Sequence, residues 1–262
     1  MNLVRERRKG AEAGIIILCG FCWLGLFFGC ASDPAMESSQ ARTKFQMGLE
    51  QASMNHQEEM IANFKEAVLL DPKNEQYRLH LAAAYFFVSD LQNAESEYLE
   101  IVKLNKESKE AYRQLGRLYM RTGDWDRAVK NFNEDLQRPG TPRPHQVYNW
   151  LALSYYNLGD FAEAERQWLK AIELKDNAAI RLNLALAYKD KERFDQALDS
   201  LRQAVALNPN FPQAHYEIAQ LLILSKEMDQ AVSHFKEVIR LAPKSEWAPL
   251  SRKYLELIQP SK

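Results

Sequence analysis

Cysteine is almost absent from the chain, and the few cysteines are confined to one end. Only Cys19, Cys22 and Cys30 occur among 262 residues, and the long remainder of the chain after Cys30 contains none. Disulfides and cysteine-based metal sites are therefore excluded for the main body of the chain. Its stability must come from the packing of side chains.

An excess of charge of either sign is also missing. The chain has 34 Lys and Arg against 35 Asp and Glu, a formal net charge of −1. Chains that bind nucleic acid usually carry a marked excess of Lys and Arg on one face. We therefore expect no nucleic-acid partner.

Sequence motifs for catalysis and cofactor binding are lacking too. The chain contains no glycine-rich phosphate loop, no Gly-x-Ser-x-Gly turn and no Cys/His metal cluster. Its five histidines are scattered at positions predicted to lie on exposed or half-buried helix surfaces: His56, His80, His145, His215 and His234. We expect neither an enzyme nor a bound metal, cofactor or small-molecule substrate.

Residues 1–29 have the layout of a secretory signal peptide. A basic start, Arg5 to Lys9, precedes an uncharged apolar run from Gly14 to Gly29. A helix of that length rises about 24 Å, which is short of the roughly 30 Å of membrane hydrocarbon. Residues 1–29 are therefore predicted to be cleaved, and an uncleaved anchor is the alternative.

The end of the apolar run, Leu26-Phe27-Phe28-Gly29-Cys30, resembles the lipobox of bacterial lipoproteins. The match departs from the family at Phe27, where leucine is preferred. The resemblance implies that Cys30 carries a lipid anchor and that the chain is a periplasm-facing lipoprotein of the cell envelope. Ala31, rather than aspartate, after the cysteine implies the outer membrane. Residues 30–40, small and polar, are predicted to be the lipidated cysteine and a flexible tether.

From residue 41 the sequence repeats itself with a period of 34 residues. Each unit has an apolar residue, a small residue and usually an aromatic residue at fixed spacing, then an alanine and a large apolar residue further on. The first part of the pattern recurs as Leu81-Ala82 and Tyr85, Leu115-Gly116 and Tyr119, Leu151-Ala152 and Tyr155, Leu184-Ala185 and Tyr188, and Ile218-Ala219 and Leu222.

This pattern resembles the tetratricopeptide repeat, in which two antiparallel helices pack through small residues. The resemblance implies an all-α, right-handed superhelical solenoid. Six units are assigned, at 41–74, 75–108, 109–142, 145–177, 178–211 and 212–245. Residues 246–262 are predicted to form a capping helix and tail, because Trp247, Leu250, Tyr254 and Leu257 follow helical spacing.

Two kinds of interruption are predicted within the repeated helices. Gly123-Asp124 and Gly159-Asp160 predict turns between paired helices, with glycine at positive φ and aspartate capping the next helix. The segment 137–144 holds three prolines between the third and fourth units. We expect it to adjust the superhelix, with a docking loop as the alternative.

Geometry typical of these repeats implies a concave groove that binds a protein partner. The residues predicted to contact that partner come from the first helices of several units: Phe86, Phe87, Arg113, Arg117, Arg121, Asn149, Tyr156 and Tyr216. The aromatic residues could instead belong to the core between units. For Phe86 and Phe87 the groove is favoured, because adjacent residues on a helix cannot both face the partner helix.

Arg113, Arg117 and Arg121 lie four residues apart and so share one stripe of a helix. They could present three guanidinium groups to an acidic partner. A solvated face balanced by acids such as Glu110 and Asp135 is the alternative. On the first hypothesis, replacing all three with alanine should weaken binding and leave melting unchanged.

A lipobox followed by six repeats resembles the pilotin-type lipoproteins of type IV pilus biogenesis. That resemblance implies a scaffold that helps the pilus secretin localise and assemble at the outer membrane. The alternatives are a general envelope adaptor that docks cell-wall hydrolases, proteases or export machinery, and an enzyme with an unrecognised site in the groove.

Overall fold

The computed structural model describes residues 34–258, and every regular element in that range is an α-helix. The helices are α1 (Pro34–Ser53), α2 (Gln57–Leu70), α3 (Glu75–Phe87), α4 (Leu91–Leu104), α5 (Lys109–Thr122), α6 (Trp125–Gln137), α7 (Pro144–Asn157), α8 (Phe161–Leu174), α9 (Ala178–Asp190), α10 (Phe194–Leu207), α11 (Pro212–Leu224), α12 (Met228–Leu241) and α13 (Trp247–Ile258).

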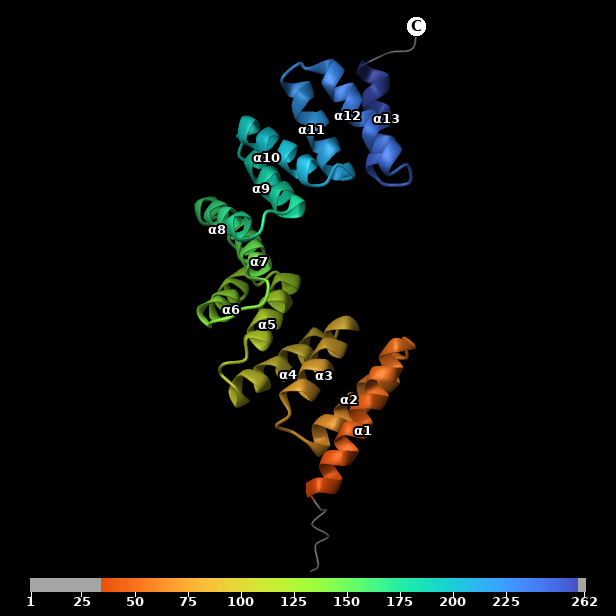
Figure 1. Ribbon diagram of the computed structural model, residues 1–262, viewed down its shortest axis with the longest axis vertical. Helices are drawn as coiled ribbons and strands as arrows, with labels where there is room; N and C mark the ends of the chain where they lie inside the picture. Colours follow the sequence, from red (N-terminus) through yellow and green to blue (C-terminus); the bar gives the residue numbers. More distant parts are fainter. Residues whose placement is uncertain (1–33, 259–262) are drawn as a thin grey trace, which may run out of the picture.

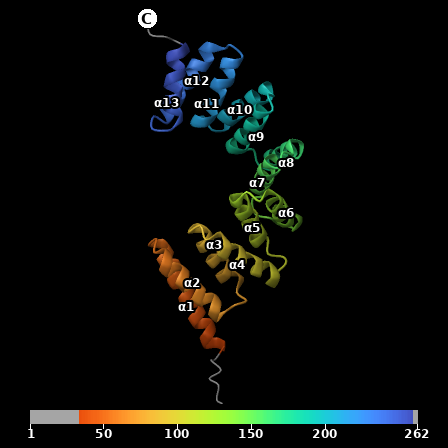
Figure 2. The ribbon, with the colours of Figure 1, turned by 180° about the vertical axis from the view of Figure 1, so that it is seen from behind.

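Successive helices form antiparallel pairs that stack into an arc (Figure 1). In the middle of the arc, α5 and α7 lie toward the concave side, and α6 and α8 lie on the outside. The view from behind shows the same arrangement (Figure 2). The predicted all-α superhelical solenoid is confirmed.

A close approach between the two helices of each pair holds the units together. In the first and third units the small residue is glycine, and a Cβ added to Gly48 or Gly116 would lie 2.5 Å from the ring of Phe64 or Phe132. The equivalent residues Ala82, Ala152, Ala185 and Ala219 are fully buried. Large residues fill the space on the second helices: Phe64, Tyr98, Phe132, Trp168, Leu201 and Phe235, each at most 2% exposed.

The turns within the third and fourth units are built as predicted. Gly123 and Gly159 adopt left-handed φ angles of 75° and 84°. The carboxylates of Asp124 and Asp160 each accept a hydrogen bond of 3.0 Å from the backbone N–H three residues later. These aspartates satisfy N–H groups that would otherwise lack a partner at the start of α6 and α8.

The start of the described chain differs from the predicted tether. Residues from Pro34 onward are helical, so the part of the predicted tether that lies within the described residues, 34–40, belongs to α1. Proline is tolerated in the first turn of a helix, and Ala, Met, Glu and Gln, which follow, are favourable helix formers. The sequence pattern does not indicate this first part of α1, because Met36 and Gln40 are exposed and no apolar periodicity precedes Ala41.

The signal peptide assigned to 1–29 and the lipid attachment at Cys30 lie outside the described residues. No helix in the range 34–258 is long and apolar enough to cross a membrane.

The proline-containing junction is fixed to the helices around it. The hydroxyl of Thr141 donates to the backbone carbonyl of Asp135 at 2.8 Å. The guanidinium of Arg138 donates to the carbonyl of Lys106 at 2.7 Å and lies 4.2 Å from the centre of the Tyr112 ring. The connection is therefore an ordered part of the stack.

Helix α13 covers the last repeat, which confirms the predicted capping helix. The ring of Tyr254 stacks on Phe235 with a centroid distance of 4.9 Å and an angle of 7° between the rings. Ala248 and Ser251 on the same helix are fully buried. The apolar end of the array is thereby shielded from water.

A pair of histidines joins α11 to α12 in the sixth unit. His215 was expected at an exposed or half-buried position, but it is only 7% exposed. Its Nε2 donates to the carbonyl of Pro209 at 2.9 Å, so in the neutral ring its Nδ1 accepts from Nδ1 of His234 at 2.8 Å. Burial, aided by the nearby His215 and Arg202, lowers the pKa of His234 to about 4.

Enlarging Gly116 should destabilise the third unit. Gly116→Val forces Phe132 away from its packed position, and overpacking of this kind costs about 1–3 kcal/mol. The measurement is the free energy of unfolding in urea. The control is Ala62→Val at an exposed position of α2, which should cost only about 0.5 kcal/mol of helix propensity. Equal losses for the two variants would contradict the close approach.

The histidine pair should make stability depend on pH. The pKa of His234 is below its ordinary value in the folded chain, so the unfolded chain binds more protons between pH 6.5 and about 4. The stabilisation is complete above pH 6.5 and is lost as the pH falls through this window, by about 1–2 kcal/mol at pH 5 once solvent screening of the half-buried ring is allowed for. Urea midpoints at pH 7 and pH 5 should differ less for His234→Gln than for the unaltered chain. An identical pH dependence would show that the pair plays no part.

Candidate protein-binding site

The inner face of the arc is formed by the first helices of successive units, α3, α5, α7 and α9 (Figure 1). Two hollows open between these helices. One, of about 230 Å³, lies between α3 and α5 and is lined in part by Leu79, Ala83 and Gln114. The other, of about 270 Å³, lies between α7 and α9 and includes Asn149 and Trp150. Both are shallow sites suited to side chains of a partner rather than to an enclosed small molecule.

Phe86 and Phe87 point to different environments. Phe86 is half-buried and packs partly against the core, with the guanidinium of Arg121 4.9 Å and that of Arg117 5.8 Å from its ring centre. Phe87 is 62% exposed and borders a hollow of about 170 Å³ beside the turn between α1 and α2. Phe87 therefore offers an open apolar surface, and Phe86 supports two arginines.

The arginine stripe does not act as one surface, because Arg113 belongs to the interior. Its Nε donates to Asp135 of α6 at 2.9 Å and its Nη1 to Glu110 at 3.0 Å. The Arg113 side chain is only 11% exposed, and that of Asp135 is fully buried. The assignment of Arg113 to partner binding was wrong. Its guanidinium is already used to compensate a buried carboxylate.

Arg117 and Arg121 keep an uncompensated charge on the inner face. Arg117 lies between the rings of Phe86 on α3 and Trp150 on α7, 5.8 and 5.5 Å from their centres. Arg121 donates to the backbone carbonyl of Phe86 at 2.9 Å and to the Ser89 hydroxyl at 2.6 Å, both neutral acceptors. Neither arginine forms a salt bridge within residues 34–258. Their stacking on aromatic rings holds both guanidiniums in place for a carboxylate.

Asn149 and Tyr156 lie at the fourth unit. The Oδ1 of Asn149 accepts from Trp168 Nε1 and from Asn183 Nδ2, both at 3.0 Å, and so ties α7 to α8 and α9. Tyr156 is half-buried against Trp168. Its pKa is raised, mainly by burial and then by a hydrogen bond with Asp190. Asn149 lines the hollow between α7 and α9, and both side chains make contacts within the stack.

Tyr216 is not available to a partner. It is 7% exposed and packs edge-on against both Phe235 and Tyr254, with centroid distances of 5.9 and 6.4 Å. The groove assignment of Tyr216 was wrong, because α13 covers the position that would face the groove in an internal unit. Position within a repeat does not indicate which units are covered at the end of the array.

Trp150 is the inner-face residue that the sequence did not single out. Its neighbour Leu151 was recognised as a core position, and the residue before that core position varies among units. This variation could have indicated that Trp150 lies at the surface, because a residue at the edge of the core can differ from unit to unit.

Family models for the tetratricopeptide repeat match residues 41–74, 113–179 and 182–246. These matches cover more than half of the chain. The chain belongs to the tetratricopeptide-repeat family.

Among its curated relatives are a mitochondrial import receptor subunit, TOM70, of Saccharomyces cerevisiae and the anaphase-promoting complex subunit cut9 of Schizosaccharomyces pombe. They are 26% identical over 75% of this chain and 24% identical over 78% of it. The chain spans about a third of the length of these relatives, 33% and 31%.

Several solved structures of tetratricopeptide-repeat proteins share the fold. PilF of Pseudomonas aeruginosa matches with a TM-score of 0.68 at 16% identity, over 84% of this chain and 99% of its own. PilW, described as a widely conserved type IV pilus biogenesis factor, matches with a TM-score of 0.70 at 16% identity, over 80% and 97%. At this identity the likeness concerns the fold.

The described part of this tetratricopeptide-repeat protein contains no group of three or more His, Cys, Asp or Glu residues arranged to hold a metal ion. What its inner face offers is a pair of fixed guanidiniums, exposed aromatic surface and shallow hollows. Such a face recognises side chains of another protein.

Single replacements should separate the structural arginine from the exposed one. Arg113→Ala leaves the Asp135 carboxylate buried without a partner and should lower the free energy of unfolding by about 3–5 kcal/mol. Arg117→Ala, on the same helix, removes exposed stacking contacts and an exposed hydrogen bond to Gln114, and should cost about 0.5–1 kcal/mol. Thermal and urea unfolding would measure both. Equal stabilities would contradict the interior role of Arg113, and the triple replacement is not expected to leave melting unchanged.

Proposed function

We propose that this protein is a membrane-anchored scaffold that binds another protein on its inner face. The observation that carries the proposal is the cluster of Phe86, Arg117, Arg121 and Trp150, which joins three consecutive units at the surface. An anchor on Cys30 would hold this face in the periplasm at the outer membrane. Nothing in this role requires catalysis.

The partner we propose is the secretin of a type IV pilus, whose localisation and assembly the scaffold would assist. Two observations support this choice: the lipobox-like segment that ends at Cys30, and a fold that matches PilF and PilW over nearly their whole length. A scaffold of this kind would travel with its anchor and carry the secretin subunit on its repeats.

A general envelope adaptor is the second candidate. The same fold matches TOM70 and Cut9, whose described roles lie outside pili. The inner face would then dock cell-wall hydrolases, proteases or export machinery rather than a secretin. The two candidates share the site and the anchor and differ only in the occupant.

Chemical crosslinking followed by pull-down from isolated outer membranes should identify the occupant. We expect the unaltered chain to recover a secretin, and Arg117→Ala with Arg121→Ala to recover at least tenfold less, as expected for loss of two central contacts. Lys65→Ala with Lys236→Ala, both at exposed positions, is the matched control.

Recovery of cell-wall enzymes without a secretin would support the adaptor and contradict the pilus role. Equal recovery by the two double variants would contradict the inner-face site. Cys30→Ser tests the anchor separately: the variant should be absent from the outer membrane, and its continued acylation would show that another cysteine is used.

A further inference from the structure

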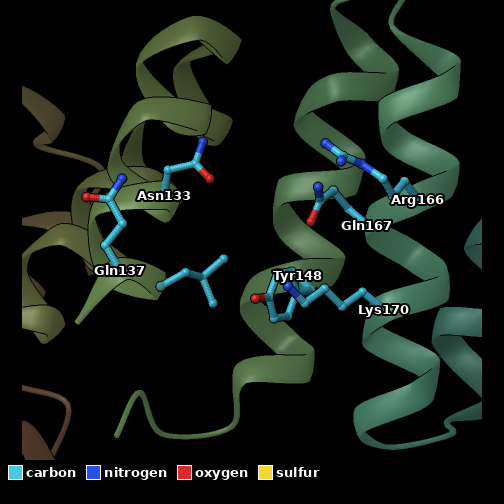
Figure 3. Close-up of a pocket in the computed structure, with 7 residues that line it drawn as sticks. Asn133, Gln137, Tyr148, Arg166, Gln167 and Lys170 are labelled. Atoms are coloured by element: carbon cyan, nitrogen blue, oxygen red, sulfur yellow. The ribbon is translucent and has the colours of Figure 1, made fainter. Parts of the chain in front are cut away.

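A further cleft lies on the outer side of the arc, away from the inner face. It has a volume of about 390 Å³ and opens between α6 and α8, with α7 behind it. Figure 3 shows Asn133 of α6 directed toward Tyr148 of α7 and toward Arg166, Gln167 and Lys170 of α8, with Gln137 beside it on α6 and its amide turned away from α7. Leu136 completes the lining.

The cleft coincides with the irregular junction of the array. The connection from α6 to α7 has six residues, 138–143, whereas the other connections between repeat pairs have three or four, such as 105–108 and 175–177. Hydrogen bonds from Arg138 and Thr141 fix this longer connection. The opening is therefore part of the folded stack and not the result of a loose loop.

Several polar groups that line the cleft are available to form hydrogen bonds with a ligand. Within residues 34–258, the side-chain amides of Asn133 and Gln137 and the hydroxyl of Tyr148 make no hydrogen bond. The Nζ of Lys170 lies 4.6 Å from the centre of the Tyr148 ring and forms no salt bridge in the same range. A ligand could thus engage these groups without breaking contacts of the protein.

The charge of the lining is positive. Arg166 is compensated by Glu163, to which it donates, so Lys170 contributes the net charge of the site. No carboxylate belongs to the lining itself. Amide and phenol donors beside an ammonium group are the chemistry that binds a carboxylate.

We propose that this outer cleft is a second docking site, which takes a carboxylate side chain from an acidic segment of a partner protein. Lys170 supplies the opposite charge, and Gln137, Asn133 and Tyr148 supply hydrogen bonds. The site lies on the face opposite to Arg117 and Arg121, so both faces can be occupied at once. The protein would then bridge two partners, or two segments of one partner, around the middle of the stack.

The test uses the full chain in detergent and a fluorescein-labelled peptide of alternating Glu and Gly, with the matching Gln and Gly peptide as the uncharged control. Fluorescence anisotropy at fixed ionic strength measures the affinity. Lys170→Glu should weaken binding of the acidic peptide about tenfold, because one attraction is replaced by a repulsion. Gln137→Ala should weaken it less, and the uncharged peptide should bind poorly to every variant.

Lys236→Glu is the matched control, since it makes the same charge change at an exposed position of α12, the second helix of the sixth unit. Equal weakening by Lys170→Glu and Lys236→Glu would overturn the proposal in favour of a response to net charge. Weakening by Arg117→Ala alone would place the peptide on the inner face and also overturn it. A third overturning result is binding of phosphatidylglycerol vesicles, but not of the peptide, that depends on Lys170. None of these results bears on recovery of a secretin, which depends on the inner face.

Discussion

The close approach of paired helices is the constraint on which the rest of this structure depends. At Gly48 and Gly116 no room exists for even a Cβ beside the facing phenylalanine ring, and the equivalent positions in the other four units are occupied by buried alanines. Because the two helices of each pair lie close together at this point, the large side chain of the second helix is completely buried. The unit then presents two helices at a fixed angle to the next unit, and the stack curves as a consequence.

That curvature creates two faces with different chemistry. Residues of three units meet on the inner face, so that a guanidinium of α5 rests between rings of α3 and α7. At the longer connection between the third and fourth units, a cleft lined by amide, phenol and basic side chains opens on the outside.

Whether an arginine of α5 belongs to the interior or to the surface depends on the residues that it contacts. Asp135 is fully buried, and the Arg113 guanidinium must remain beside it because a lone buried carboxylate would be costly. Arg117 and Arg121, one and two turns further along, meet only aromatic rings and neutral acceptors. Three residues of one type at one spacing thus have different roles.

The sequence by itself determined the number and pairing of the helices, their turns and the solenoid, because these follow from short-range spacing that recurs in every unit. It also indicated the face that carries Phe86, Arg117 and Arg121. It did not reveal that Arg113 and Tyr216 are enclosed, that His215 and His234 meet, or that Trp150 completes the inner face. Those facts depend on contacts between different helices, whose residues lie far apart in the sequence, and only the packed structure decides which residue stands opposite which.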